Sequence, residues 1–255
     1  MCDGLGLKRD DCFEKTDLIK RIEEYLETKK QKKANNAANN FTEKEKPAQN
    51  AAFSNTQQSS AFTPSSDFSY MPENDTVSFK IVSIGNQEVG KSCLIKRYCE
   101  GKFVKRYIST IGVDYGVRKL NLKNHPISIN FFDLSGYEDY KLIRTEFYED
   151  TSGLLMVYDV DNKDSFASLV HWEDEAKRGG VDLSRVKVVV AGNKSDSKGR
   201  EVQMKDAAAW AKKRNYGFFE TSALSAQNVN ECFEALFGLC LDQYLEDKKK
   251  FGFKK

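Results

Sequence analysis

The chain has 255 residues, with 40 Lys or Arg against 38 Asp or Glu, so its formal net charge is +2. This length suffices for one domain with an appendage, and the near-neutral balance disfavours nucleic-acid binding through bulk charge. The six cysteines form no CxxC pair and there are only two histidines, so we expect no zinc site. No apolar run approaches the ~20 residues of a membrane span, and no signal peptide is visible. We therefore expect a cytoplasmic protein with reduced thiols, a nuclear location remaining open.

The first 75 residues divide into two segments of different composition. Residues 1–30 are charged, and apolar residues recur at helical spacing after Thr16, which predicts a short helix. Residues 11–22 resemble the second half of a SAP-like helix–loop–helix, and we expect contact with a protein, or a frayed helix, rather than nucleic-acid binding. Residues 31–75 are rich in Asn, Ala, Gln and Ser, and such polar tracts predict a disordered linker.

Residues 76–247 alternate β-rich and helical runs, which predicts an α/β domain. Strands are expected at 78–84, 115–122, 127–132, 153–158, 186–191 and 217–219, and helices from 91, near 140–148, from 165, near 204–213 and from 229. The alternation indicates a mostly parallel six-stranded sheet with helices on both faces. A turn at 123–126 is too short for a crossover, so one edge strand should be antiparallel. Ligands of such sheets bind beyond the carboxyl ends of the strands.

A glycine-bearing loop follows the first predicted strand and opens a helix. It matches the GxxxxGK[ST] pattern with Gly85-Asn86-Gln87-Glu88-Val89-Gly90-Lys91-Ser92. In such a P-loop, backbone N–H groups surround phosphate oxygens, the lysine adds a point charge, and the hydroxyl of Ser92 is offered to Mg²⁺. The residues expected at the phosphates are Gln87, Glu88, Val89, Gly90, Lys91, Ser92 and Cys93.

Two further motifs follow the last two predicted strands and favour guanine over adenine. Asn193-Lys194-Ser195-Asp196 places a carboxylate, expected to be buried, where it can accept two hydrogen bonds from guanine N1 and N2. The Lys194 stem can cover the base, and a backbone N–H of Thr221-Ser222-Ala223 can meet the guanine oxygen. This pair of motifs disfavours a P-loop kinase or ATPase. The residues expected at the base are Asn193, Lys194, Asp196, Ser222, Ala223 and Leu224.

With these motifs the chain resembles the Ras superfamily, and within it the Rab-like members. Ser109-Thr110-Ile111-Gly112-Val113-Asp114-Tyr115 is similar to the Rab switch I sequence. The resemblance implies a small GTPase domain that binds GTP or GDP with Mg²⁺, and it implies that Thr110 contacts Mg²⁺ and the γ-phosphate. It also places Phe103 edge-on against the base and Tyr107 over the phosphates, although both residues could simply anchor a loop.

The DxxG motif of that superfamily matches Asp133-Leu134-Ser135-Gly136-Tyr137. By resemblance, Asp133 holds Mg²⁺ through water and the Gly136 N–H senses the γ-phosphate. Loss of that phosphate would release both switch segments. The metal set implied is Ser92, Thr110 and Asp133.

Residues 77–247 are most similar to the RabJ subgroup. The matching runs include 82–86, 96–100, 110–117, 146–148 and 157–160. Many members of that subgroup carry a J domain, but no His-Pro-Asp motif occurs here, so we expect none. The predicted basic tail, 248–255, contains no cysteine, and we therefore expect no prenylation and no stable membrane anchor.

The chain departs from the superfamily at the residue that orients the attacking water. Tyr137 stands where most small GTPases have Gln. Gln87 and Glu88 stand where the family often has small residues, and Gln87 could crowd an arginine finger. We expect a GTP hydrolase with slow turnover, water as nucleophile, and Lys91, Thr110, Gly136 and Tyr137 as the catalytic groups. Two alternatives remain: a pseudo-GTPase that binds without turnover, and a Tyr137 that packs outward while a partner positions the water. Effectors, exchange factors and GTPase-activating proteins are expected but not identified, and a monomer is expected.

Overall fold

The computed structural model describes residues 76–251 of the chain. The predicted N-terminal helix (1–30), the predicted linker (31–75) and residues 252–255 of the predicted basic tail lie outside the described residues. The strands are β1 Val77–Ile84, β2 Val113–Leu122, β3 His125–Leu134, β4 Gly153–Asp159, β5 Lys187–Asn193 and β6 Gly217–Glu220. The helices are α2 Lys91–Glu100, the 3₁₀ turn η2 Glu138–Tyr140, α3 Lys141–Thr145, α4 Lys163–Ala167, α5 Leu169–Arg178, α6 Met204–Lys212 and α7 Val229–Phe251.

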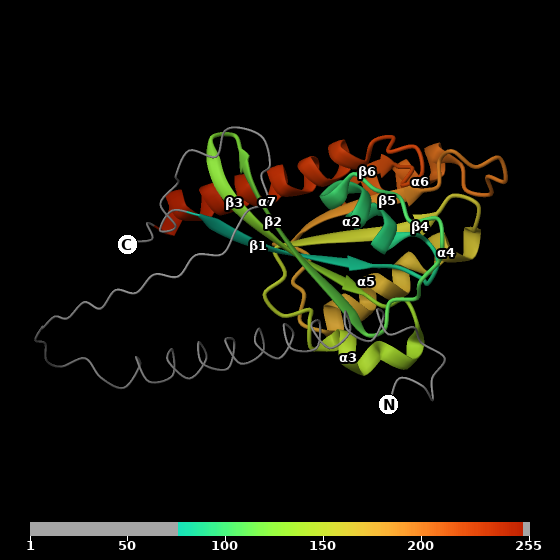
Figure 1. The fold of residues 1–255 in the computed structure, drawn as a ribbon. Helices are drawn as coiled ribbons and strands as arrows, with labels where there is room; N and C mark the ends of the chain where they lie inside the picture. Colours follow the sequence, from blue (N-terminus) through green and yellow to red (C-terminus); the bar gives the residue numbers. More distant parts are fainter. Residues whose placement is uncertain (1–75, 252–255) are drawn as a thin grey trace, which may run out of the picture. The chain divides into compact units, whose positions relative to one another are not determined.

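The six strands form one sheet in the order β2-β3-β1-β4-β5-β6 (Figure 1). All neighbours are parallel except β2 and β3, which pair antiparallel at one edge. The predicted fold class, a mostly parallel six-stranded sheet with one antiparallel edge strand, is confirmed. Because the parallel strands end at one edge, the loops that carry the sequence motifs converge there.

Side chains alternate between the two faces of the sheet, and helices cover both. On one face, Phe79 and Leu155 belong to a core cluster with Phe233 and Phe237 of α7, and Leu94 of α2 joins it. On the other face, the ring of Tyr158 in β4 lies 4.9 Å from the ring of Phe166 in α4. Phe166 in turn contacts Trp210 of α6 with ring centroids 5.8 Å apart. The sheet is thus the middle layer of three.

The hairpin between β2 and β3 has a tighter turn than the sequence predicted. Only Lys123 and Asn124 separate the two strands, with left-handed φ angles of 50° and 63°. Two left-handed residues in succession make the turn that suits the twist of adjoining antiparallel strands. His125 and Pro126, predicted as turn residues, therefore begin β3.

Two predicted helices have different bounds in the structure, whereas the helix predicted from 229 begins at Val229. The helix expected near 140–148 ends at Thr145, because the N–H groups of residues 146–148 bond to carbonyls three residues earlier, which makes turns rather than α-helix. The helix expected from 165 is two helices, α4 and α5, that meet at Ser168. Helix α7 continues to Phe251, so the predicted domain end at 247 falls inside a helix. Its last turn holds Lys248, Lys249 and Lys250, where positive charge suits the helix dipole.

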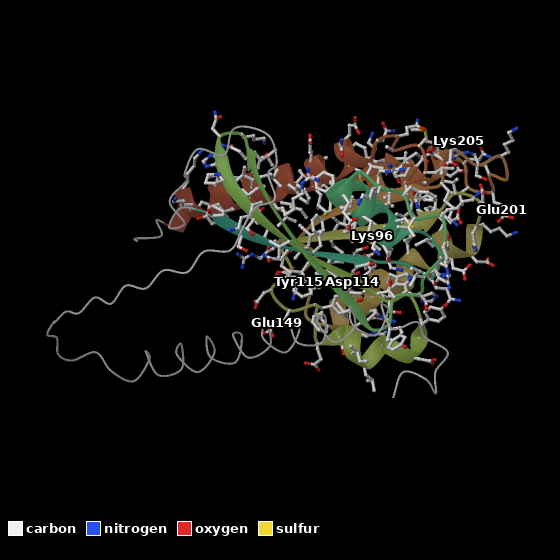
Figure 2. The ribbon with its side chains drawn as sticks, viewed as in Figure 1. Lys96, Asp114, Tyr115, Glu149, Glu201 and Lys205 are labelled. Carbon is white, nitrogen blue, oxygen red and sulfur yellow. The ribbon has the colours of Figure 1, made fainter. Side chains whose placement is uncertain are left out.

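The start of α4 is fixed by two polar side chains. Asn162 caps the helix by accepting the Ser165 N–H, and the Glu201 carboxylate accepts the Lys163 N–H at 3.0 Å. Figure 2 labels Glu201, together with Lys205 of α6, at the edge of the domain. Among the described helices, none combines the length and the apolar character needed to cross a membrane.

The buried and exposed side chains of α7 should contribute differently to the free energy of unfolding. Phe237 is fully buried, whereas Leu239, two residues further on, is 39% exposed. Phe237→Ala should lower the free energy of unfolding by about 3–5 kcal/mol, because it leaves a cavity among aromatic rings. The matched Leu239→Ala should change it by no more than about 0.5 kcal/mol. Urea unfolding followed by circular dichroism measures both, and equal effects would contradict this assignment of the core.

Candidate functional site

Most of the predicted site residues line one cavity of about 500 Å³ at the carboxyl ends of the strands. Three of the predicted residues, Val89, Asp133 and Ser222, are buried and do not line it. The Val89 side chain belongs to the core, so only its backbone can serve a ligand. The predicted residues that line the cavity are Gln87, Glu88, Gly90, Lys91, Ser92, Cys93, Phe103, Tyr107, Thr110, Gly136, Tyr137, Asn193, Lys194, Asp196, Ala223 and Leu224.

The loop between β1 and α2 turns at Gly90, which has a left-handed φ of 96° and caps α2. A Cβ at this position would lie 2.3 Å from Asn193 Nδ2, so a larger residue cannot fit. Lys91 follows and is only 6% exposed. Its Nζ donates to the carbonyl oxygens of Gly85 and Asn86, at 2.7 and 2.9 Å, which holds the ammonium over the loop.

Three oxygen-bearing side chains from different segments meet beside the loop. Ser92 Oγ donates to Asp133 Oδ2 at 2.5 Å and lies 2.9 Å from Thr110 Oγ1. The other carboxylate oxygen, Asp133 Oδ1, is buried and has no hydrogen-bond partner among the described residues. Hydroxyl and carboxylate oxygens are the donors that Mg²⁺ prefers. The structure therefore brings together the three residues predicted to hold a metal. The unpartnered Asp133 Oδ1 is the oxygen that could bind the metal ion.

The two buried charges at this site also fit a magnesium–phosphate ligand. Burial lowers the pKa of Lys91 to about 8, although the nearby Asp133 opposes the shift. Burial likewise raises the pKa of Asp133 to about 6, against the effects of Lys91 and the Ser92 hydroxyl. An anion beside Lys91 would favour its charged form, and a divalent cation beside Asp133 would favour the carboxylate.

The side-chain amide of Asn193 joins the P-loop to the base-side loop. Its Nδ2 donates to the Val89 carbonyl at 2.8 Å, and its Oδ1 accepts from the Ala223 N–H at 3.2 Å. The N–H predicted to meet the guanine oxygen is thus engaged by Asn193 in this structure. A base would have to share it, as bifurcated hydrogen bonds do.

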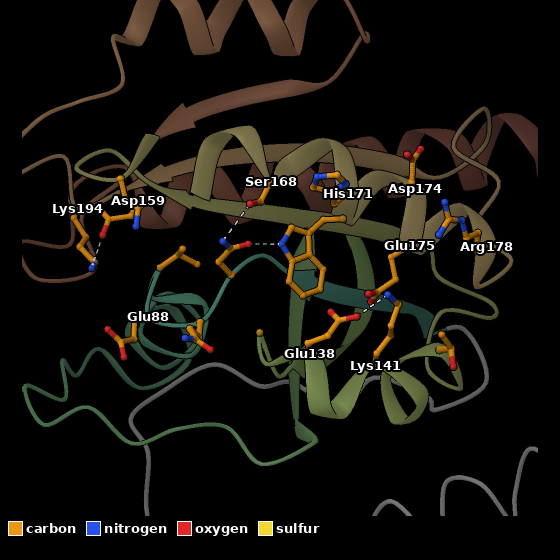
Figure 3. A pocket seen from close by; sticks show the side chains of 17 residues that line it. Glu88, Glu138, Lys141, Asp159, Ser168, His171, Asp174, Glu175, Arg178 and Lys194 are labelled. Atoms are coloured by element: carbon orange, nitrogen blue, oxygen red, sulfur yellow. Dashed lines mark hydrogen bonds and ion pairs between the residues drawn. The ribbon is translucent and has the colours of Figure 1, made fainter. Parts of the chain in front are cut away.

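The carboxylate predicted to recognise guanine is oriented by a neighbour. Asp196 Oδ1 accepts a hydrogen bond from the buried Ser222 hydroxyl. Asp196 itself is exposed in the cavity that it lines, so its burial beneath a base stays a prediction. Lys194 has a left-handed φ of 66°, and its Nζ lies 2.6 Å from Asp159 Oδ2, a pair that Figure 3 shows.

Two tyrosines face each other at the phosphate end of the cavity. The hydroxyl oxygens of Tyr107 and Tyr137 lie 3.4 Å apart, and both residues line the cavity. Tyr137 therefore does not pack outward, which was one alternative from the sequence. Burial, together with the hydrogen bond to the Tyr137 hydroxyl, raises the pKa of Tyr107, so Tyr107 is a neutral phenol at pH 7.

Arg97 of α2 is a site residue that no motif identified. Its guanidinium donates to the carbonyl oxygens of Ala223, Leu224 and Gly101, at 2.8, 2.9 and 2.7 Å. It also lies 5.9 Å from the centre of the Phe103 ring. Arg97 thus fixes the base-side loop and the start of the segment that carries Phe103. The one signal in the sequence was a basic residue in the last turn of a helix, a position where arginine can serve free carbonyls.

A second cavity, of about 850 Å³, lies on the other side of the P-loop and is bounded by α5. Figure 3 shows Ser168, His171, Asp174 and Glu175 on the α5 side of it, opposite Glu138 and Lys141. Gln87 and Glu88 line both cavities, so the loop separates them.

Comparison with known proteins places these features in a family. Residues 80–241 match the model of the Ras family. A protein of Xenopus laevis named DnaJ homolog subfamily C member 27-A is 43% identical over 169 residues, which cover 64% of this chain and 61% of that relative. The Gallus gallus and Homo sapiens proteins named DnaJ homolog subfamily C member 27 are each 43% identical, over 169 and 162 residues, covering 64% and 62% of this chain. This chain spans 61% and 59% of the length of those two relatives.

The exposed carboxylate of Asp196 generates a test of base recognition. Asp196→Asn exchanges an acceptor for a donor, so GTP should bind at least about 100-fold more weakly through the loss of two charge-assisted hydrogen bonds. Xanthosine triphosphate, which carries an oxygen at C2 instead of an amino group, should gain affinity. Asp206→Asn, an exposed residue in the first turn of α6, is the matched control. Competition binding measures both, and unchanged selectivity in Asp196→Asn would contradict this role.

Proposed function

This chain belongs to the Ras family, and from that membership we propose that it is a guanine-nucleotide-dependent switch of the Rab-like kind, most similar to the RabJ subgroup. The runs of sequence shared with that subgroup and the identity of 43% to the relatives described above support the proposal. Those relatives are named as DnaJ homologues, and their matched part is about three-fifths of their length. A function that depends on the remainder of those proteins is not carried over to this chain.

In the proposed complex the two ends of the cavity have separate tasks. The loop amides and Lys91 bind the phosphates and stabilise the charge that develops during transfer to water. Ser92, Thr110 and Asp133 would hold Mg²⁺, which supplies further charge stabilisation at the phosphate oxygens. Asp196, oriented by Ser222, selects guanine. The observation that carries this assignment is the meeting of Ser92, Thr110 and Asp133 around an unpartnered buried oxygen.

We propose further that hydrolysis is slow, for a reason that lies at Tyr137. An amide offers a donor and an acceptor at the same time and can orient a water molecule through both. A phenol offers one hydroxyl, and here that hydroxyl lies 3.4 Å from the Tyr107 hydroxyl. Two facing phenols at the phosphate end leave the attacking water without the paired contacts of an amide.

Replacement of Tyr137 tests the slow-turnover proposal. Tyr137→Gln should raise the single-turnover rate of GTP hydrolysis by at least about 10-fold, because it restores a donor–acceptor pair for water. Tyr137→Phe, which keeps the ring and removes the hydroxyl, is the matched control and should stay as slow as the wild type. The proposal fails if the wild type already hydrolyses GTP as fast as Tyr137→Gln.

The second candidate function, a pseudo-GTPase that binds GTP without turnover, is favoured by the same tyrosine pair. Chromatography of the nucleotide released from the purified protein distinguishes the readings. Bound GTP with no conversion over hours supports the pseudo-GTPase, and bound GDP supports a working hydrolase. A protein that carries and binds no nucleotide would contradict both.

Ras-family membership implies regulators and effectors in general, and the surface around the switch segments suits them. Apolar side chains are exposed there at Ile108, Ile111, Leu142 and Ile143, with exposures of 60%, 48%, 84% and 46%. Exposed apolar groups gathered beside a nucleotide-dependent loop are suited to protein contacts. The identity of these partners, the monomeric state and the cytoplasmic location stay predictions from the sequence.

A further inference from the structure

The second residue of the P-loop is held by side chains from the helix layer behind it. Asn86 Oδ1 accepts a hydrogen bond from the Trp172 indole Nε1–H at 2.7 Å. Asn86 Nδ2 donates to the Ser168 hydroxyl at 3.3 Å, and this bond is drawn in Figure 3. Trp172 is 8% exposed, so its N–H has little access to water, and the bond to Asn86 satisfies it.

A face of the same indole contacts a buried arginine. The guanidinium carbon of Arg144 lies 4.7 Å from the centre of the Trp172 ring, and Arg144 is fully buried. Two hydrogen bonds of 2.8 Å to Glu175 balance its charge, and the Tyr148 hydroxyl donates to the same carboxylate at 2.8 Å. A bidentate pair of this kind fixes the plane of the guanidinium.

The remaining nitrogen of Arg144 reaches the DxxG segment. Its Nη1 donates to the carbonyl oxygens of Ser135, at 3.1 Å, and of Tyr137. These carbonyls flank Gly136, so one buried side chain holds the backbone on both sides of that glycine. Gly136 in turn lies against the P-loop, because a Cβ there would be 2.2 Å from the Gln87 nitrogen.

We infer that Trp172 is a positioning residue that couples the P-loop to the DxxG segment, through its N–H bond to Asn86 and its ring contact with Arg144, and thereby favours the nucleoside triphosphate over the diphosphate. The inference rests on the proposed function and adds a residue that no motif contains. Asn86 and Arg144 belong to segments 58 residues apart in sequence, and they are linked through one side chain of α5.

The preference for the triphosphate follows from which nucleotide needs Gly136. In the proposed function the Gly136 N–H meets the third phosphate, as the resemblance of the DxxG motif implies, and the P-loop binds the first two phosphates. Holding Gly136 beside Asn86 and Gln87 before ligand binding removes an ordering cost that only the triphosphate would bear. Weakening the coupling should therefore lower triphosphate affinity and leave diphosphate affinity nearly unchanged.

Trp172→Phe is the sharpest variant, because it keeps an aromatic ring at this position and removes the N–H donor together with the five-membered part of the indole. We expect the affinity for a non-hydrolysable GTP analogue to fall by about 3- to 10-fold, the range for one buried hydrogen bond. GDP affinity should change by less than about 2-fold. The chain has two tryptophans, so Trp210→Phe is the matched control. Trp210 lies on α6, stacked on Arg214 at 3.9 Å and next to Phe166, and its replacement should change neither affinity.

A double-mutant cycle with Asn86→Ala separates this bond from general loosening. If the bond carries the effect, Trp172→Phe combined with Asn86→Ala should cost no more triphosphate affinity than the larger single change.

Other outcomes would contradict the inference, and each of them points to a different cause. Equal losses of GDP and triphosphate affinity would make Trp172 a general packing residue, and additive effects in the cycle would exclude the bond to Asn86 as the route. An unchanged affinity ratio in Trp172→Phe would reject the coupling itself. Failure of the wild-type protein to bind either nucleotide would instead overturn the proposed function, and this inference with it.

Discussion

The arrangement of the cavity depends on one pair of residues. Asn193 contributes its side-chain amide, and Gly90 leaves room for that amide because it has no side chain. The amide nitrogen occupies the space that a Cβ at residue 90 would need, at 2.3 Å, and donates to the neighbouring Val89 carbonyl. The amide oxygen accepts from Ala223 at the other end of the cavity. Because one planar group makes both contacts, the distance between the phosphate end and the base end is set by the protein before a ligand arrives. Such preorganisation reduces the ordering cost of binding.

Two buried cations, Arg144 and Lys91, lie near the P-loop, and their surroundings give them different roles. Arg144 has a carboxylate partner in Glu175 and two backbone carbonyls, so its charge is balanced within the protein. Removing either member of such a pair leaves a buried charge, which is strongly destabilising. Lys91 is held by the carbonyls of Gly85 and Asn86, and burial disfavours its charge. The first cation therefore organises the fold, and the second is suited to an external anion.

The sequence could predict those features of the fold and the site that depend on local sequence patterns. Alternating strands and helices, the GxxxxGK[ST] loop and the order of the motifs located the sheet and the cavity. The bounds of α3 and the turn before His125 were missed, because the hydrogen bonds to carbonyls three residues earlier after Thr145 and the left-handed backbone at Asn124 decide them. Contacts across the fold, such as that of Trp172 with the P-loop, have no signature at fixed spacing. The exposure of Asp196 likewise depends on how several loops surround the cavity.

Contacts inside the domain and contacts at the phosphate end differ in strength, and this difference determines which segment can act as the switch. Gly136 is held by Arg144 from inside the domain, through contacts that no nucleotide makes. The segment before β2 is attached differently, since Thr110 reaches Ser92 and Tyr107 reaches Tyr137 through hydroxyl groups at the phosphate end. These are neutral, partly solvent-accessible hydrogen bonds, each worth only about 0.5–1.5 kcal/mol. A change at the third phosphate can therefore outweigh them, whereas the buried arginine contacts would persist. The segment that carries Tyr107 and Thr110 should thus respond to the nucleotide more than the start of the DxxG segment.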